Sequence, residues 1–233
     1  MKRILFCVLA SFLLSASLTC FSQQTDIRQF TVFGAYTYLD TRSLNLVQRG
    51  FDGDVGYNYR SWLSLGFDFG YYDGHNTIFP NELTPAGQAL VGPLVELGVP
   101  GVPFNIQTLT YEAGPQLNYR HLKKVTFFVR PALGALHATA KVKSSFLASL
   151  NGEEPGLATE FCAVLLGCSK NDTVPFYGFG GGFSWEITPH FGLRVTGDFA
   201  HYDFFSALLN GGRNSVRVSI GPKFSFGKNI VQK

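Results

Sequence analysis

Ionisable side chains recur at alternate positions in several segments, between small or polar neighbours. Asp68 lies between Gly66 and Gly70 in this sense, while Phe67 and Phe69 occupy the intervening positions. Because alternate residues of an extended chain share a face, each such segment has one charged face and one apolar face. Acids and bases nearly balance on the charged faces, which favours ion pairing. We predict a network of nine side chains: Arg60, Asp68, Glu112, Arg130, Glu186, Arg194, Asp198, Arg217 and Lys223. Further charges on such faces are Asp52, Asp54 and Arg120.

The composition excludes several classes of protein. Charged residues make up 15% of the 233 residues, against about 25% in ordinary soluble proteins. Aromatic residues also make up 15%, which argues against a disordered chain. The formal net charge is only +3, Lys2 and Arg3 supply part of it, and no long basic run follows. We therefore expect no nucleic-acid partner.

The first 22 residues have the layout of a secretory signal peptide. Lys2 and Arg3 form a basic start, residues 4–14 are apolar, and residues 15–22 are small or polar. The apolar part is shorter than the roughly 20 residues of a membrane-spanning helix. We expect cleavage near residue 22 and a single domain over residues 23–233.

Removal of that leader would leave two cysteines, Cys162 and Cys168, in an exported chain. Two close cysteines in a predicted loop of an exported protein indicate a disulfide, with free thiols as the alternative. No histidine or further cysteine lies near them, so we expect no metal site. The glycine run 178–182 has no helix after it, so we expect no nucleotide site and no cofactor.

Eight segments show the apolar–polar alternation of β-strands. They are residues 29–39, 50–60, 62–73, 105–119, 124–141, 174–187, 191–203 and 215–227. Three connections are tight, and four are longer, at 40–48, 74–104, 142–173 and 204–214. Short and long connections alternate, as in an up-and-down antiparallel barrel with short turns at one end and long loops at the other.

The apolar faces decide which solvent surrounds such a barrel. They contain few charges, and aromatic residues gather near the segment ends, as in the interfacial girdles of membrane barrels. The predicted girdle is Tyr57, Tyr59, Trp62, Tyr71, Tyr119, Trp185 and Tyr202. We predict an all-β, eight-stranded transmembrane β-barrel with short periplasmic turns and long extracellular loops. The alternative is a soluble, lipocalin-like barrel with its apolar faces inward.

Residues 53–71, GDVGYNYRSWLSLGFDFGY, resemble a hairpin of the small outer-membrane β-barrel proteins. Residues 111–137 and 176–202 resemble further hairpins, and RVSIGPKFSF at 217–226 resembles a closing strand. The resemblance implies the fold of the transmembrane domain of outer membrane protein A. The sequence departs from that pattern because GKNIVQK follows Phe226, and we expect no peptidoglycan-binding domain. We therefore do not expect cell-wall anchoring.

The resemblance implies an outer-membrane location in a Gram-negative-type cell, contact with its lipid, and insertion by the barrel-assembly machinery. We expect a non-enzymatic protein with a structural or surface-interaction role, and an extracellular partner at 74–104 and 142–173. One alternative is a narrow channel for small solutes. Another is an outer-leaflet lipid-modifying enzyme, for which His201 with Asp203 and Ser206, or His137 with Thr139, are the candidates.

Overall fold

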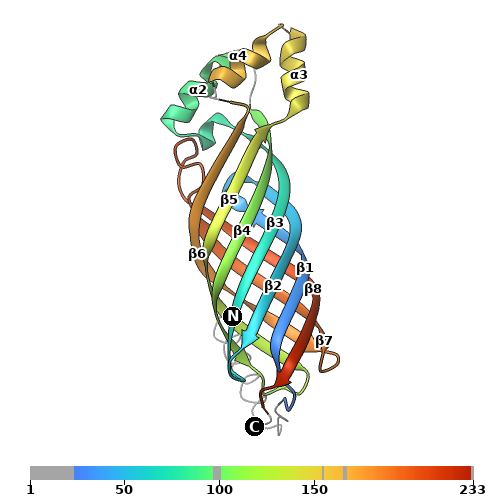
Figure 1. Cartoon of the computed structure of the whole chain (residues 1–233). Helices are drawn as coiled ribbons and strands as arrows, with labels where there is room; N and C mark the ends of the chain where they lie inside the picture. Colours follow the sequence, from blue (N-terminus) through green and yellow to red (C-terminus); the bar gives the residue numbers. More distant parts are fainter. Residues whose placement is uncertain (1–23, 97–100, 154, 165–166, 232–233) are drawn as a thin grey trace, which may run out of the picture.

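The computed structural model describes residues 24–96, 101–153, 155–164 and 167–231. The predicted signal peptide lies outside these residues. Eight antiparallel strands form a closed barrel in which each strand pairs with the next and β1 pairs with β8 (Figure 1). The strands are β1 (Arg28–Thr41), β2 (Leu46–Asn58), β3 (Leu63–Ile78), β4 (Val102–Tyr119), β5 (Val125–Val142), β6 (Ser169–Glu186), β7 (Phe191–Tyr202) and β8 (Arg213–Asn229). The predicted eight-stranded up-and-down barrel is confirmed.

The apolar faces of the strands point outward. Phe67, Phe127 and Phe224 are about half exposed, whereas Asp68 and Arg130 are buried in the interior. A soluble barrel that binds apolar ligands would have the opposite arrangement, so this alternative is wrong. In β5 the outward apolar run from Val125 to Ala135 is about 25 Å tall for a strand tilted by about 40°. This matches the apolar band of a transmembrane barrel.

All four long connections are shorter than predicted, and the first of them becomes a tight turn. The loop expected at 40–48 consists only of residues 42–45, because β1 and β2 pair up to Thr41 and Leu46. The 3-10 helix η2 (Arg42–Leu44) and Asn45, in the left-handed conformation at φ 46°, close this hairpin. Short and long connections therefore do not alternate strictly. Apolar alternation fades where a strand leaves the membrane, although its backbone ladder continues, so the prediction ended these strands too early.

Strands β3 to β6 extend beyond the rest of the barrel and carry most of the helical structure (Figure 1). The β3–β4 connection contains η3 (Pro80–Glu82) and α2 (Pro85–Glu96), and the β5–β6 connection contains α3 (Ser144–Glu153) and α4 (Leu157–Val164). We call α2, α3 and α4 the cap. The start of β1 and the end of β8 pair at the opposite end of the barrel, at Arg28 and Asn229. No helix of the described residues is long and apolar enough to cross a membrane.

The interior has two layers of different chemistry. The half near the chain ends is filled mainly by charged and polar side chains, whereas the half near the cap is mostly apolar, with Gln48, Thr108 and Arg213 buried among the apolar side chains. Ile106, Leu136 and Phe176 are buried in this apolar half and belong to one cluster with Leu83 and Phe161, which come from the loops. The prediction did not foresee an apolar interior at this end.

Candidate functional site

The centre of the barrel holds two arginines that share three carboxylates. Arg217 on β8 contacts acids from β2, β3 and β4 across the lumen and from the neighbouring strand β7. Its guanidinium nitrogens lie 3.0 Å from Glu112, 3.0 Å from Asp198, 3.1 Å from Asp68 and 3.7 Å from Asp52. The Arg217 side chain is only 7% exposed. One guanidinium therefore joins strands that are not neighbours in the sheet.

Arg130 on β5 completes this centre from the other side. Its nitrogens lie 3.1 Å from Asp198, 3.3 Å from Asp68, 3.6 Å from Glu112 and 3.8 Å from Asp54. Asp68, Glu112 and Asp198 thus contact both arginines. Such a network is costly to desolvate, and it is maintained only when each charge has partners. Its geometry suits cross-linking of the barrel wall.

Gly180 gives Asp198 room to reach the centre. The two residues face each other on β6 and β7. A Cβ atom at position 180 would lie 1.8 Å from an Asp198 carboxylate oxygen. Asp198 cannot easily move away because Arg130 and Arg217 both hold it. A glycine is therefore required at this position of the lumen.

Arg194 on β7 lies closer to the chain ends and uses both ionic and aromatic contacts. Its Nη1 atom lies 3.0 Å from Asp54. Its guanidinium carbon lies 4.1 Å from the ring centre of Phe128 and 5.5 Å from that of Phe33, and both rings are buried in the lumen. Cation–π contacts of this kind become stronger away from water. Arg194 therefore forms an ion pair with Asp54 and also packs against two aromatic rings in the lumen.

A separate pair lies nearest the chain ends. Lys223 on β8 donates a hydrogen bond to Glu186 on β6. Arg120, which follows β4, donates to Asn58 Oδ1 at 2.7 Å. The structure therefore divides the predicted network into a central cluster and this lower pair.

Three members of the central cluster, Asp52, Asp54 and Tyr72, were not in the predicted network. Asp52 accepts hydrogen bonds from Thr37 at 2.9 Å, from Ser219 at 2.6 Å and from Tyr72. Asp54 accepts from Arg194. Tyr72 also accepts a bond from Arg217 at 3.1 Å. The alternation of β3 places Tyr72 on the face of Asp68, and this signal could have identified it.

The structure contradicts two predicted site residues. Arg60 is exposed in the turn between β2 and β3, with its guanidinium carbon 5.7 Å from the ring centre of Tyr59. It lies outside the lumen because β2 ends at Asn58, before Arg60. Tyr202 is not part of a girdle: it is 4% exposed, and its hydroxyl lies 2.9 Å from that of Thr41 inside the barrel.

The other predicted girdle residues lie on the outer surface. They are Tyr57, Tyr59, Trp62, Tyr71, Tyr119 and Trp185, and each is at least 37% exposed. Tyr59, Trp62, Tyr119 and Trp185 are near the turns at the lower end in Figure 1, whereas Tyr71 lies farther along β3. This lower band of rings is in the position of an interfacial girdle.

The cysteines and histidines are placed as follows. Cys162 in α4 and Cys168, just before β6, form a disulfide with their Cα atoms 4.8 Å apart. His201 Nδ1 lies 2.8 Å from Asn214 and His137 Nδ1 lies 2.7 Å from Thr173. Within the described part of the chain, neither histidine forms a hydrogen bond with Asp203, Ser206 or Thr139. In the described part of the chain, no cluster of three or more His, Cys, Asp or Glu side chains could hold a metal ion.

Comparisons with known proteins agree with this architecture. No family model and no curated protein matches the sequence. The crystal structure of the outer membrane protein OprG from Pseudomonas aeruginosa matches 88% of this chain and 99% of its own, at 10% identity and a TM-score of 0.51. Two further structures each match 84% of this chain and 96% of their own. One is Neisserial surface protein A, at 14% identity and a TM-score of 0.48. The other is Ail of Yersinia pestis in complex with the heparin analogue sucrose octasulfate, at 15% identity and a TM-score of 0.45.

The likeness to OprG shows the fold alone, since the identity is low. It agrees with the closed, all-antiparallel sheet of this chain. This chain therefore has the fold of the small, eight-stranded outer-membrane β-barrels.

Proposed function

We propose that the protein is a closed, non-enzymatic barrel of the outer membrane that displays its cap for surface interaction. The observation that carries the proposal is the filled interior. Arg130 and Arg217 hold acids from opposite walls, so their side chains cross the lumen. A conducting path would require these pairs to separate.

The small size of the cavities at the centre of the lumen supports this role, whereas spaces of about 30 Å³ and 260 Å³ lie at the lower end beside Glu186. One cavity of about 20 Å³ lies beside Tyr72, Glu112 and Tyr202, and another of about 10 Å³ lies beside Gln116 and Arg130. A water molecule needs roughly 10–15 Å³ of such space. Each central cavity therefore has room for about one water, and this favours a structural role over a channel.

The cap supports a role in interaction. Strands β5 and β6 remain paired as far as Lys141 and Ser169, so a short turn there would suffice to join them. The chain instead builds α3 and α4, whose Phe146 and Phe161 rings pack edge to face with centres 5.9 Å apart. Ordered structure beyond the barrel is where such a protein can contact a partner.

The first test is conductance of the full-length protein in planar bilayers. We expect no discrete conductance steps for the protein as it is. The variants Arg217→Met and Arg130→Met should also show no discrete conductance steps if the barrel remains closed. Regular steps in the unaltered protein that change with either substitution would instead establish the channel.

The second test replaces residues 143–168 by a short turn between Val142 and Ser169. We expect the variant to insert with a heat-modifiable gel band and to lose attachment of expressing cells to a panel of immobilised matrix proteins and glycans. A second variant, Phe146→Ala, removes only the α3–α4 ring contact and serves as a milder comparison. Unchanged attachment by the deletion variant would overturn the role of the β5–β6 loop.

Export through a cleaved leader and insertion by the assembly machinery are part of the same proposal. The outward Phe224 and Phe226 near the end of β8 supply the alternating aromatic residues of a closing strand. The mass of the protein purified from the outer-membrane fraction tests cleavage near residue 22.

A further inference from the structure

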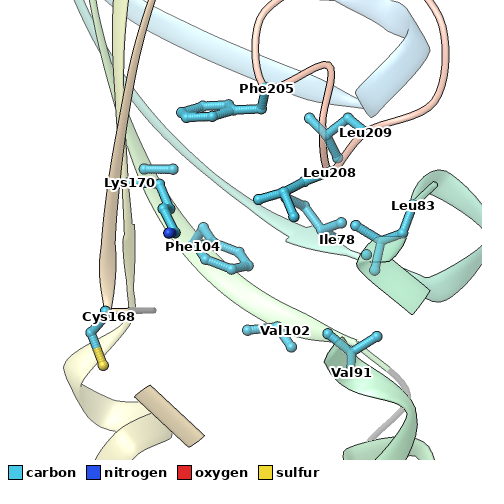
Figure 2. A pocket seen from close by; sticks show the side chains of 13 residues that line it. Ile78, Leu83, Val91, Val102, Phe104, Cys168, Lys170, Phe205, Leu208 and Leu209 are labelled. Carbon is cyan, nitrogen blue, oxygen red and sulfur yellow. The ribbon is translucent and has the colours of Figure 1, made fainter. Parts of the chain in front are cut away.

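A cavity of about 70 Å³ lies at the outer mouth of the barrel (Figure 2). One wall is the inner face of the extended strands, represented by Val102, Phe104 and Ala140. The opposite wall is formed by Val91 of α2 and Leu209 of the β7–β8 connection. The cavity is separate from the charged centre, and its lining comes from segments that are distant in the sequence.

The lining is almost wholly apolar. Figure 2 shows Leu83, Val91, Val102 and Leu209 around the same space as Phe104. Among the described lining residues, Lys170 is the one with a charged side chain. A water molecule inside a protein needs two to four polar partners, and an apolar cavity stays dry. This space is therefore poorly suited to water and well suited to an apolar group.

The side of the cavity formed by η3 and α2 is held to the β7–β8 connection by polar contacts. The Thr84 backbone N–H donates to the Leu208 carbonyl at 2.9 Å, and its hydroxyl donates to the Ala207 carbonyl at 2.9 Å. Asn210 donates to the Leu83 carbonyl at 2.6 Å. These bonds keep a wall of the cavity in place, so the space does not simply collapse when it is empty.

The close approach of α2 to this connection depends on a glycine. A Cβ atom at Gly87 would lie 2.7 Å from the Leu208 carbonyl oxygen and 3.1 Å from Leu83 Cβ. At Gly92, in the same helix, a Cβ atom would meet nothing within 4 Å. Of these two glycines in α2, only Gly87 is needed for the close contact between the helix and the β7–β8 connection at the cavity.

We propose that this cavity is a binding site for the apolar end of a small molecule, a short or branched alkyl group that enters from the outer aqueous side. An empty apolar cavity forfeits dispersion contacts, which an alkyl group restores. A dry cavity of about 150 Å³ can hold benzene. The present cavity has about half that volume, so it fits a group smaller than a benzene ring. This proposal goes beyond the surface-interaction role and does not depend on it.

The test uses full-length protein in lipid nanodiscs, with xenon and n-butanol as probes. Methyl NMR resonances of Val91, Val102 and Leu209 should shift with both probes and saturate. Ala140→Leu fills the cavity and should weaken the apparent affinity at least tenfold. Thr139→Leu changes the neighbouring residue, whose side chain is on the other face of β5, and should bind as the unaltered protein does.

Two further variants keep the test decisive if Ala140→Leu fails to fold. Val91→Phe fills the cavity from α2 and should also abolish the saturable shifts. Gly87→Ala should displace α2 and weaken binding, whereas Gly92→Ala should have no effect. The proposal is overturned if the unaltered protein shows no saturable shift at these methyl groups, which would leave a packing void. It is also overturned if the cavity-filling variants bind as tightly as the unaltered protein.

Discussion

At the scale of single residues, the central feature is that two guanidiniums share acids from several strands. Asp68, Glu112 and Asp198 each contact both Arg130 and Arg217. Removal of one arginine therefore weakens the compensation of three buried carboxylates at once. A single substitution in the network therefore lowers the stability of the barrel strongly. The complete network nevertheless adds little to the free energy of unfolding compared with a well-packed apolar lumen.

Arg217→Met should lower the free energy of unfolding by about 3–5 kcal/mol, because it leaves buried carboxylates without a partner. The exposed Arg60 provides the matched control, and Arg60→Met should change this free energy by less than about 0.5 kcal/mol. Urea unfolding in micelles, followed by the heat-modifiable gel band, measures both. Equal unfolding midpoints for the two variants would contradict the shared network.

At the scale of elements, the cap is joined to the barrel by covalent and apolar links. The Cys162–Cys168 disulfide fixes the end of α4 to the start of β6, six residues away. Phe161 of α4 is buried in the apolar cluster that continues into the upper interior. The barrel wall itself does not include either cysteine. Stability of the cap and of the barrel can therefore be changed separately.

Cys162→Ser should destabilise the cap by about 2 kcal/mol through the entropy of the short loop that it opens. We expect faster proteolysis within residues 143–168 and an unchanged urea midpoint of the barrel. Reduction of the unaltered protein should reproduce this result, and the variant should not respond to reductant. A large fall in the barrel midpoint would show that the cap and the barrel unfold together.

At the scale of the whole molecule, the outward residues define where the membrane ends. The exposed apolar belt gives way to polar side chains above Tyr71 on β3 and Leu133 on β5, and Gln107 on β4 and Asn171 on β6 lie beyond that border. The tips of β3 to β6 and the cap therefore project beyond the apolar belt into water. The cavity at the mouth lies in this projecting part.

Nitroxide labels test this position of the membrane. Labels at Phe67→Cys and Leu133→Cys should collide with oxygen dissolved in lipid, and labels at Gln107→Cys and Asn171→Cys should collide with a water-soluble nickel chelate. The native cysteines are replaced by serine in all four variants. Oxygen-dominated collisions at positions 107 and 171 would place the membrane border higher and the cavity within the bilayer.

The local order of the chain was predictable from the sequence. Period-two alternation assigned Phe67 and Asp68 to opposite faces, and three tight connections made neighbouring strands antiparallel. The sparse charge of the apolar faces indicated lipid as their solvent. The spacing of Cys162 and Cys168 also indicated the disulfide that the structure contains. These features depend on residues that are near one another in the chain, so a single sequence is sufficient.

The tertiary structure alone decided which charges meet and where each strand stops. Arg217 and Asp68 are 149 positions apart and join across the lumen, which depends on the stagger of eight strands and not on alternation. Alternation along β7 already places Tyr202 on the inner face of Asp198, although the prediction assigned it to the girdle, and the structure shows that it meets Thr41 there. The end of β2 at Asn58 leaves Arg60 outside. The apolar cavity is formed by α2, the β7–β8 connection and the tips of β3 to β6 together. Alternation specifies a face, whereas register and closure specify the partner on that face.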